Sequence, residues 1–184
     1  MRSILSLFVV ILIGVAGIAS PVFAQSQKNV SVFEAGTVKL SLPDIAGKKW
    51  NSVRDCKTAK THYSFCAQIA SIPATVGVVE VAKGASAESQ AFLSGQAVFL
   101  KYKDDPGLAL VSRQLMVKTG AEDLHVWIHD FSLETGKYSW AIGCANRRCV
   151  HFYFSVAAPM SSELVRSLFA GVTIGKDTDK GVPR

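Results

Sequence analysis

Two arginines stand side by side in the four-residue segment between a close pair of cysteines. Arg147 and Arg148 follow Asn146, and the flanking cysteines are Cys144 and Cys149. A disulfide across this segment would hold both guanidinium groups in place, and a preorganised pair loses little entropy when it binds. Guanidinium groups bind carboxylate or phosphate oxygens in a bidentate manner. The segment therefore favours an anionic partner, and a merely solubilising surface is the plain alternative.

A second concentration of positive charge lies between residues 48 and 60, around a tryptophan. This stretch holds five basic residues and one acid, Asp55, so it carries +4 of the net charge. The net charge of +6 falls to +5 when Arg2 is removed with the leader described below. A charge of +5 is modest for neutralising phosphates, and export removes the usual target, so no nucleic-acid partner is expected. We expect partner binding here by Lys48, Lys49, Trp50, Arg54, Lys57 and Lys60.

The remaining residues with catalytic potential lack the spacing that catalysis needs. His125 and His129 alternate with apolar residues as in a strand, so at about 3.3 Å per residue they lie about 13 Å apart, too far for one metal ion. Ser86 lacks the second glycine of a nucleophile elbow. No Walker loop, dinucleotide fingerprint or C-x2-C motif is present. We therefore expect no enzyme, metal or cofactor; an unrecognised site at His125, His129 and His151, taken as exposed, is the alternative.

The first 24 residues have the pattern of a signal peptide. Arg2 precedes an apolar stretch from Ile4 to Ala19, and a small-residue cleavage site ends at Ala24. The stretch is shorter than the ~20 residues of a membrane-spanning helix. The sequence thus predicts a signal peptide over residues 1–24 and a periplasmic or secreted protein, with an uncleaved anchor as the alternative.

Four cysteines follow the leader, and an even number in an exported chain favours disulfides. Four cysteines permit three pairings. We favour the local one, in which Cys56 pairs with Cys66 and Cys144 with Cys149, closing rings of 11 and 6 residues. The chain-entropy relation gives these rings roughly 3 and 2 kcal/mol of stabilisation.

Hydrophobic periodicity predicts one α+β domain over residues 25–175, followed by a loose tail over 176–184. Apolar spacing of seven residues predicts a helix over 86–102, and similar spacing after Ser161 predicts a C-terminal helix that ends near Gly171. Short connections require antiparallel neighbours. We expect a single antiparallel sheet of about six to seven strands with both helices packed on it, its strands lying near 37–42, 63–69, 76–81, 108–117, 124–131, 137–144 and 150–157.

The last two predicted strands each carry an alternating apolar set. Tyr138, Trp140 and Ile142 share one face of the first strand. The second strand presents Val150, Phe152, Phe154 and Val156. We expect the two sets to meet in the core.

The segment Val38 to Pro43 leading to Trp50, the mid-chain helix, the hairpins around Gly120 and Gly136 and the closing helix together resemble the PsbP-like domains. The layout covers most of the mature chain. That family includes exported accessory proteins of bacterial envelopes and photosynthetic membranes. The resemblance implies a binding or assembly role.

Two further similarities keep alternatives open. The invasion-associated locus B family of exported bacterial proteins is similar in its tryptophan ahead of two cysteines and its later close pair, which here are Trp50, Cys56, Cys66, Cys144, Cys149 and Val150. The C-x4-C loop also resembles that of Ivy-type lysozyme inhibitors, although theirs carries a histidine. We expect a non-enzymatic exported binding or accessory protein of the envelope that recognises a protein or anionic component. A hydrolase inhibitor and a virulence-associated exported protein are the alternatives.

Overall fold

The protein is described by a computed structural model that covers residues 29–54, 57–58, 61–81, 86–120, 122–156 and 158–176. The predicted leader, Cys56, Lys60 and most of the predicted tail lie outside the described residues. Within the described part of the chain, no helix is both long and apolar enough to cross a membrane.

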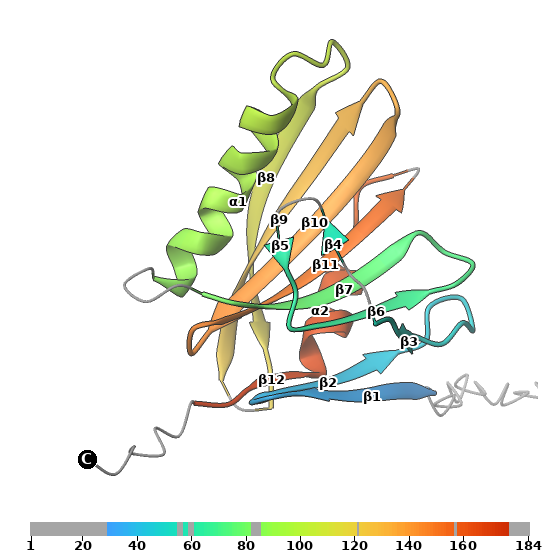
Figure 1. The fold of residues 1–184 in the computed structure, drawn as a ribbon, viewed down its shortest axis with the longest axis vertical. Helices are drawn as coiled ribbons and strands as arrows, with labels where there is room; N and C mark the ends of the chain where they lie inside the picture. Colours follow the sequence, from blue (N-terminus) through green and yellow to red (C-terminus); the bar gives the residue numbers. More distant parts are fainter. Residues whose placement is uncertain are drawn as a thin grey trace, which may run out of the picture.

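The largest element is a seven-stranded sheet in which every neighbouring pair is antiparallel (Figure 1). Four consecutive long strands form most of it, because turns of a few residues join them as hairpins. The order across the sheet is β3 (Asn51–Ser52), β6 (Phe65–Ile69), β7 (Ala74–Glu80), β11 (Arg148–Val156), β10 (Gly136–Ala145), β9 (Asp123–Leu133) and β8 (Ala109–Lys118). Six of the seven predicted strands are confirmed in this sheet, with small changes at their ends; β3 was not predicted, and the predicted strand over 37–42 lies in another sheet.

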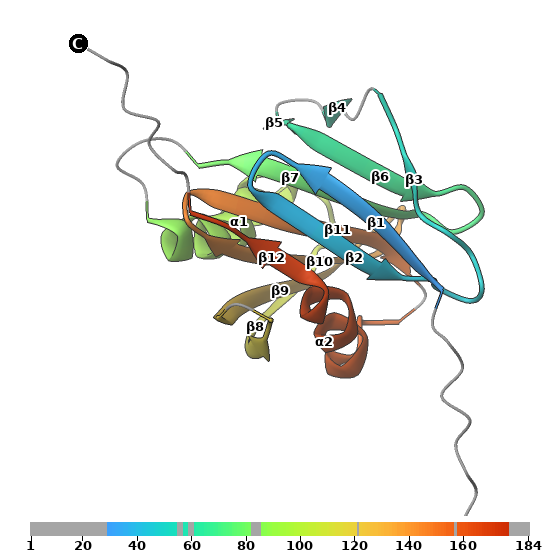
Figure 2. The same ribbon diagram turned by 90° about the horizontal axis from the view of Figure 1, so that it is seen from below.

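The prediction of a single sheet is wrong. A three-stranded sheet contains β1 (Val30–Ala35), β2 (Val38–Pro43) and β12 (Val172–Ile174). The chain returns after the last helix and pairs β12 with β2, a contact between distant segments that no local pattern announces. Figure 2 shows this sheet lying across β7, β11 and β10. A separate two-stranded ribbon contains β4 (Lys57–Thr58) and β5 (Thr61–His62).

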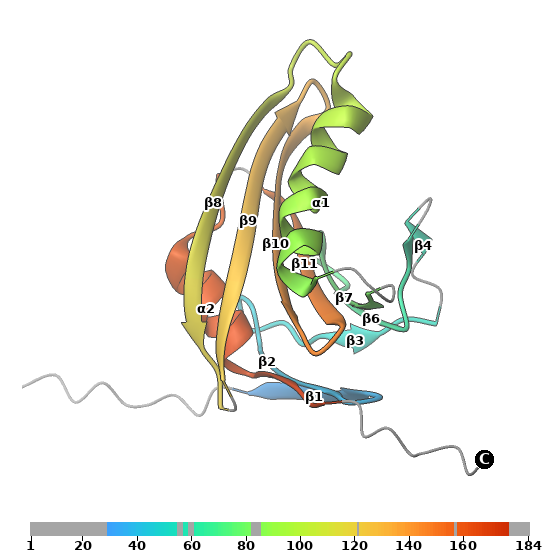
Figure 3. The same ribbon diagram turned by 90° about the vertical axis from the view of Figure 1, so that its left-hand side faces the viewer.

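The two helices begin after serine caps, within one residue of their predicted starts. The Ser86 hydroxyl accepts from the amide of Ser89 at the start of α1 (Ala87–Tyr102). Ser161 caps α2 (Ser162–Ala170) in the same way. The helices cover opposite faces of the seven-stranded sheet (Figure 3). Gly171 follows the last residue of α2, and a glycine is required there because a Cβ would lie 1.9 Å from the carbonyl oxygen of Ser41.

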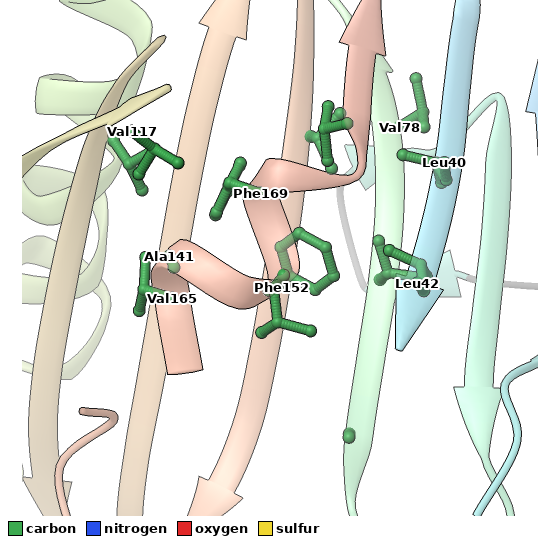
Figure 4. Packing of buried hydrophobic residues seen from close by; sticks show 14 of the residues in the cluster. Leu40, Leu42, Val78, Val117, Ala141, Phe152, Val165 and Phe169 are labelled. Atoms are coloured by element: carbon green, nitrogen blue, oxygen red, sulfur yellow. The ribbon is translucent and has the colours of Figure 1, made fainter. Parts of the chain in front are cut away.

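The main core fills the space between the seven-stranded sheet, the three-stranded sheet and α2. Phe169 of α2 packs edge-on against Phe152 of β11, with ring centroids 4.9 Å apart, and Leu40 of β2 belongs to the same cluster (Figure 4). A smaller buried cluster lies on the other face of the large sheet and includes Ala91 of α1 and Ile142 of β10. The large sheet is therefore apolar on both faces.

The register of the last hairpin overturns one packing prediction. Trp140 pairs with Tyr153, and Ile142 pairs with His151, so Phe152 and Ile142 point to opposite faces. Phe152 accordingly belongs to the main core and Ile142 to the smaller cluster. The two alternating sets do not meet, because a two-residue turn fixes the register and a shift by one residue would reverse every side chain.

Candidate functional site

The Arg147–Arg148 segment is a tight turn between two strands. Asn146 and Arg147 both have positive φ, 46° and 61°, as the inner positions of a type I′ hairpin turn require. Cys144 and Cys149 face each other directly across the strands and form a disulfide. This pairing is confirmed. Cys66 is disulfide-bonded as well, and its predicted partner lies outside the described residues.

The two guanidinium groups of this turn do not project freely. Nη2 of Arg147 lies 3.9 Å from Oε1 of Glu80, and Nη1 of Arg148 lies 3.8 Å from Oε2 of the same carboxylate. The Arg148 side chain is 16% exposed and that of Arg147 is 43% exposed. The turn therefore presents one accessible arginine beside an acid instead of a pair of free cations.

Asn146 fastens this turn to the C-terminal strand. Its Nδ2 donates to the carbonyl oxygen of Ile174 at 2.9 Å and approaches Oε1 of Glu122 at 3.4 Å. These contacts use both amide hydrogens within the fold. Asn146 therefore acts as a structural residue, which its position in a polar turn did not reveal.

Trp50 lies in the core rather than on the surface. It is 3% exposed, and its ring meets Phe152 and Phe154 edge-on. Its Nε1 donates to the carbonyl oxygen of Pro43 at 3.1 Å, which satisfies the buried indole N–H. The prediction that Trp50 contacts a partner is wrong. In the sequence, a single aromatic residue among charged residues indicated a contact residue. In the structure, Trp50 instead anchors the basic segment to the domain.

Lys48, Lys49 and Arg54 are exposed around this buried anchor. A tight turn with Ala46 and Gly47 at positive φ brings Lys48 back against Ile45. Among the described residues, no ion pair within 4.0 Å involves any of the three cations. We call these three residues the basic rim. Of the other two candidates, Lys57 is described only by its backbone in β4, and Lys60 lies outside the described residues.

Lys48 and Lys49 of the basic rim are separated from the arginine turn by most of the length of a strand. Asn51, next to the rim, pairs with Gln68, which pairs with Thr75 near the start of β7. Arg148 pairs with Glu80 at the end of β7. Five residues of strand span about 17 Å. The two lysines and the arginine turn therefore do not form one basic surface.

His129 is buried under α1, contrary to the expectation of an exposed position. Its Nδ1 lies 2.9 Å from the Ser112 hydroxyl, and its Nε2 lies 3.1 Å from the carbonyl oxygen of Ala91. Nε2 must donate to that carbonyl, which leaves Nδ1 to accept from Ser112 in the neutral ring. Burial lowers the pKa of His129, so the neutral form is favoured.

An open groove of about 340 Å³ runs between α1 and β8. Sequence reasoning missed it, although the three apolar rows of the helix were visible as a seven-residue spacing. The described residues of its walls include no Asp, Glu, Lys or Arg. The groove is lined by Phe92, Gly95, Gln96, Phe99, Leu100, Leu110, Ser112 and His129. It is suited to apolar groups.

The described ranges contain no cluster of three or more His, Cys, Asp or Glu side chains placed to hold an ion. His125 and His129 stay on one strand, β9, as the sequence predicts. His125 is exposed and lies 3.0 Å from Nε2 of Gln114.

Comparison with known proteins shows a fold but no family. No family model matches the chain, and no curated protein matches it. The structure is similar to the solution structure of cyanobacterial PsbP from Synechocystis, with a TM-score of 0.53 and 9% identity over 86% of this chain and 100% of the other. A protein from Bacteroides thetaiotaomicron is matched with a TM-score of 0.43 and 16% identity over 82% of this chain and 50% of the other. The chain therefore has a PsbP-like fold.

Proposed function

We propose that this protein is a non-enzymatic exported binding or accessory protein of the cell envelope, and that it recognises an acidic partner protein through the basic rim of Lys48, Lys49 and Arg54. The observation that carries the proposal is the exposure of three like charges on a segment fixed to the core by Trp50. The Cys144–Cys149 disulfide and the signal-peptide pattern support export to an oxidising compartment.

Preorganisation is the physical reason to favour this segment. Two hydrogen bonds hold Trp50 in place, one from its backbone amide to the Ser31 hydroxyl at 3.2 Å and one from its indole to Pro43. The backbone that carries the lysines is thus ordered before a partner arrives, which lowers the entropic cost of association. Complementary charge then acts mainly on the association rate, and its effect weakens as salt increases.

The test is a triple charge reversal of the basic rim, Lys48→Glu, Lys49→Glu and Arg54→Glu. We expect crosslinked capture of envelope proteins by the purified protein to fall by at least about tenfold at low salt, because rim charges govern electrostatic encounter. Capture by the unchanged protein should itself decline as salt is raised.

The matched control is a reversal of the same size at exposed positions elsewhere, Lys118→Glu, Lys137→Glu and Lys176→Glu. It changes the net charge equally and should leave capture near its original level. Equal losses of capture in the two triple variants would show a general effect of net charge. The basic rim would then not be the binding site.

A further inference from the structure

The outer surface of α1 is apolar where a solvated helix would be polar. Ala91 and Val98, seven residues apart, face the sheet and are buried. The parallel rows are exposed: Phe92 and Phe99 are 47% and 52% exposed, and Leu93 and Leu100 are 45% and 67% exposed. The helix therefore presents an apolar stripe, away from the core, that the described residues leave exposed.

From this stripe and the adjoining groove, we propose that the protein forms a two-fold symmetric dimer in which α1 of one copy packs against α1 and the groove of a second copy. We call Phe92, Leu93, Phe99 and Leu100, with the groove, the α1 surface. The helix lies over β9, β10 and β11 (Figure 3), and the groove reaches Leu110 and Ser112 of β8, an edge strand of the large sheet. The proposal does not depend on the basic rim.

The area fits what a stable dimer needs. The four exposed side chains supply on the order of 400 Å² of apolar surface, at the size where a patch usually marks an interaction site. A standard interface takes about 800 Å² from each partner, and about 65% of a homodimer interface is apolar. The four side chains therefore supply most of that apolar part, and the groove walls can supply the rest.

One surface that carries both an apolar row and a groove can pair with its own copy, which favours a second copy over an unrelated partner. Leu93 and Leu100 form a row along the helix, and Phe92 and Phe99, together with Leu100, line the groove beside it. A two-fold axis places the apolar row of each copy over the groove of the other, so one surface serves both sides. Because the groove carries no formal charge among its described walls and His129 is held neutral, packing it against its own copy leaves no charge unpaired.

Sedimentation equilibrium of the purified protein tests the proposal. We expect a mass of two chains with a dissociation constant of about 10 μM or tighter. Leu100→Glu should raise that constant by at least about tenfold, because it places a charge within the apolar interface. Val32→Glu is the matched control, since Val32 of β1 is 58% exposed on the other sheet, and it should leave the dimer intact.

A mixing experiment then separates specific pairing from misfolding. Leu100→Glu and Leu100→Lys should each be monomeric alone, with circular dichroism like that of the unchanged protein. Mixed together they should associate, because the mixed dimer holds opposite charges where each variant alone would hold like charges. A monomeric unchanged protein, equal effects of Leu100→Glu and Val32→Glu, or failure of the mixed variants to pair would each overturn the proposed dimer.

Discussion

His151 shows how one buried residue links packing to pH. It is 9% exposed on β11 and lies against Tyr63 and Trp140, with ring centroids 5.9 and 5.4 Å away. Its Nδ1 has no hydrogen-bond partner among the described groups. Burial lowers the pKa of His151 to about 4, because the charged ring would lose its hydration without gaining an acceptor.

This pKa predicts a loss of stability in acid. Between about pH 6.5 and 4 the unfolded chain binds a proton at His151 that the folded chain does not, so the free energy of unfolding falls as the pH falls through this window. The contribution lost by pH 4 is roughly 3 kcal/mol. His151→Phe should weaken the pH dependence of the free energy of unfolding, measured by urea unfolding. The part due to His129, whose pKa is also lowered, should remain.

His125→Phe is the control at an exposed histidine of the same sheet, and it should keep the full pH dependence. A profile with the same slope for His151→Phe and the unchanged protein would contradict the assignment to His151.

At the scale of elements, the contact between α1 and the sheet depends on a glycine. Gly95 faces β9, and a Cβ there would lie 2.6 and 2.7 Å from two atoms of the His129 ring. His129 in turn bonds the Ala91 carbonyl one turn earlier in the helix. The sequence showed only a glycine inside a helical pattern, which costs helix stability. The close approach of the helix to the sheet explains why it is there.

Gly95→Ala should therefore destabilise the protein, although alanine is favoured over glycine within helices by about 1 kcal/mol. The clash with His129 forces the helix to lift or the ring to move, at a cost of about 1–3 kcal/mol. We expect a lower midpoint in thermal unfolding. Gln96→Ala, at the exposed neighbouring position, should change the midpoint little. A Gly95→Ala midpoint equal to or above that of the unchanged protein would show that α1 has room to move outward.

At the scale of the whole molecule, a polar network fastens the C-terminal segment to the large sheet. Nε of Arg113 on β8 lies 3.3 Å from Oδ2 of Asp130 on β9, and its Nη1 donates to the Ser162 hydroxyl at 3.1 Å. The guanidinium also bonds the carbonyl oxygen of Met160. Ser139 of β10 donates to Asp130 and accepts from the amide of Met160 at 3.0 Å. Three strands and the start of α2 are thereby joined.

Arg113→Met should lower the free energy of unfolding by about 2 kcal/mol, because it leaves the mostly buried Asp130 carboxylate without its cation. Urea unfolding measures the loss. Adding Asp130→Asn should recover part of it, since the uncompensated charge is gone. Arg166→Met, which removes an exposed bond to the Met116 carbonyl, is the control and should have a smaller effect. If Arg113→Met is no less stable than Arg166→Met, the network does not contribute to stability as proposed.

The sequence by itself determined the local features of this protein. Alternation and helical spacing predicted the hairpin strands and both helices, the serines before each helix marked its start, and two cysteines five residues apart indicated their own disulfide. Each of these signals acts over a few residues, so the repeat of apolar residues in the sequence matches the repeat of the helix or strand that forms.

Only the tertiary structure decided what each face meets. It buried Trp50, placed Glu80 beside the arginine turn and added the β1–β2–β12 sheet. It also left two apolar rows of α1 uncovered. A periodic pattern states that a face is apolar but does not say which distant segment will cover it, because that choice depends on strand register and on contacts between residues far apart in the chain.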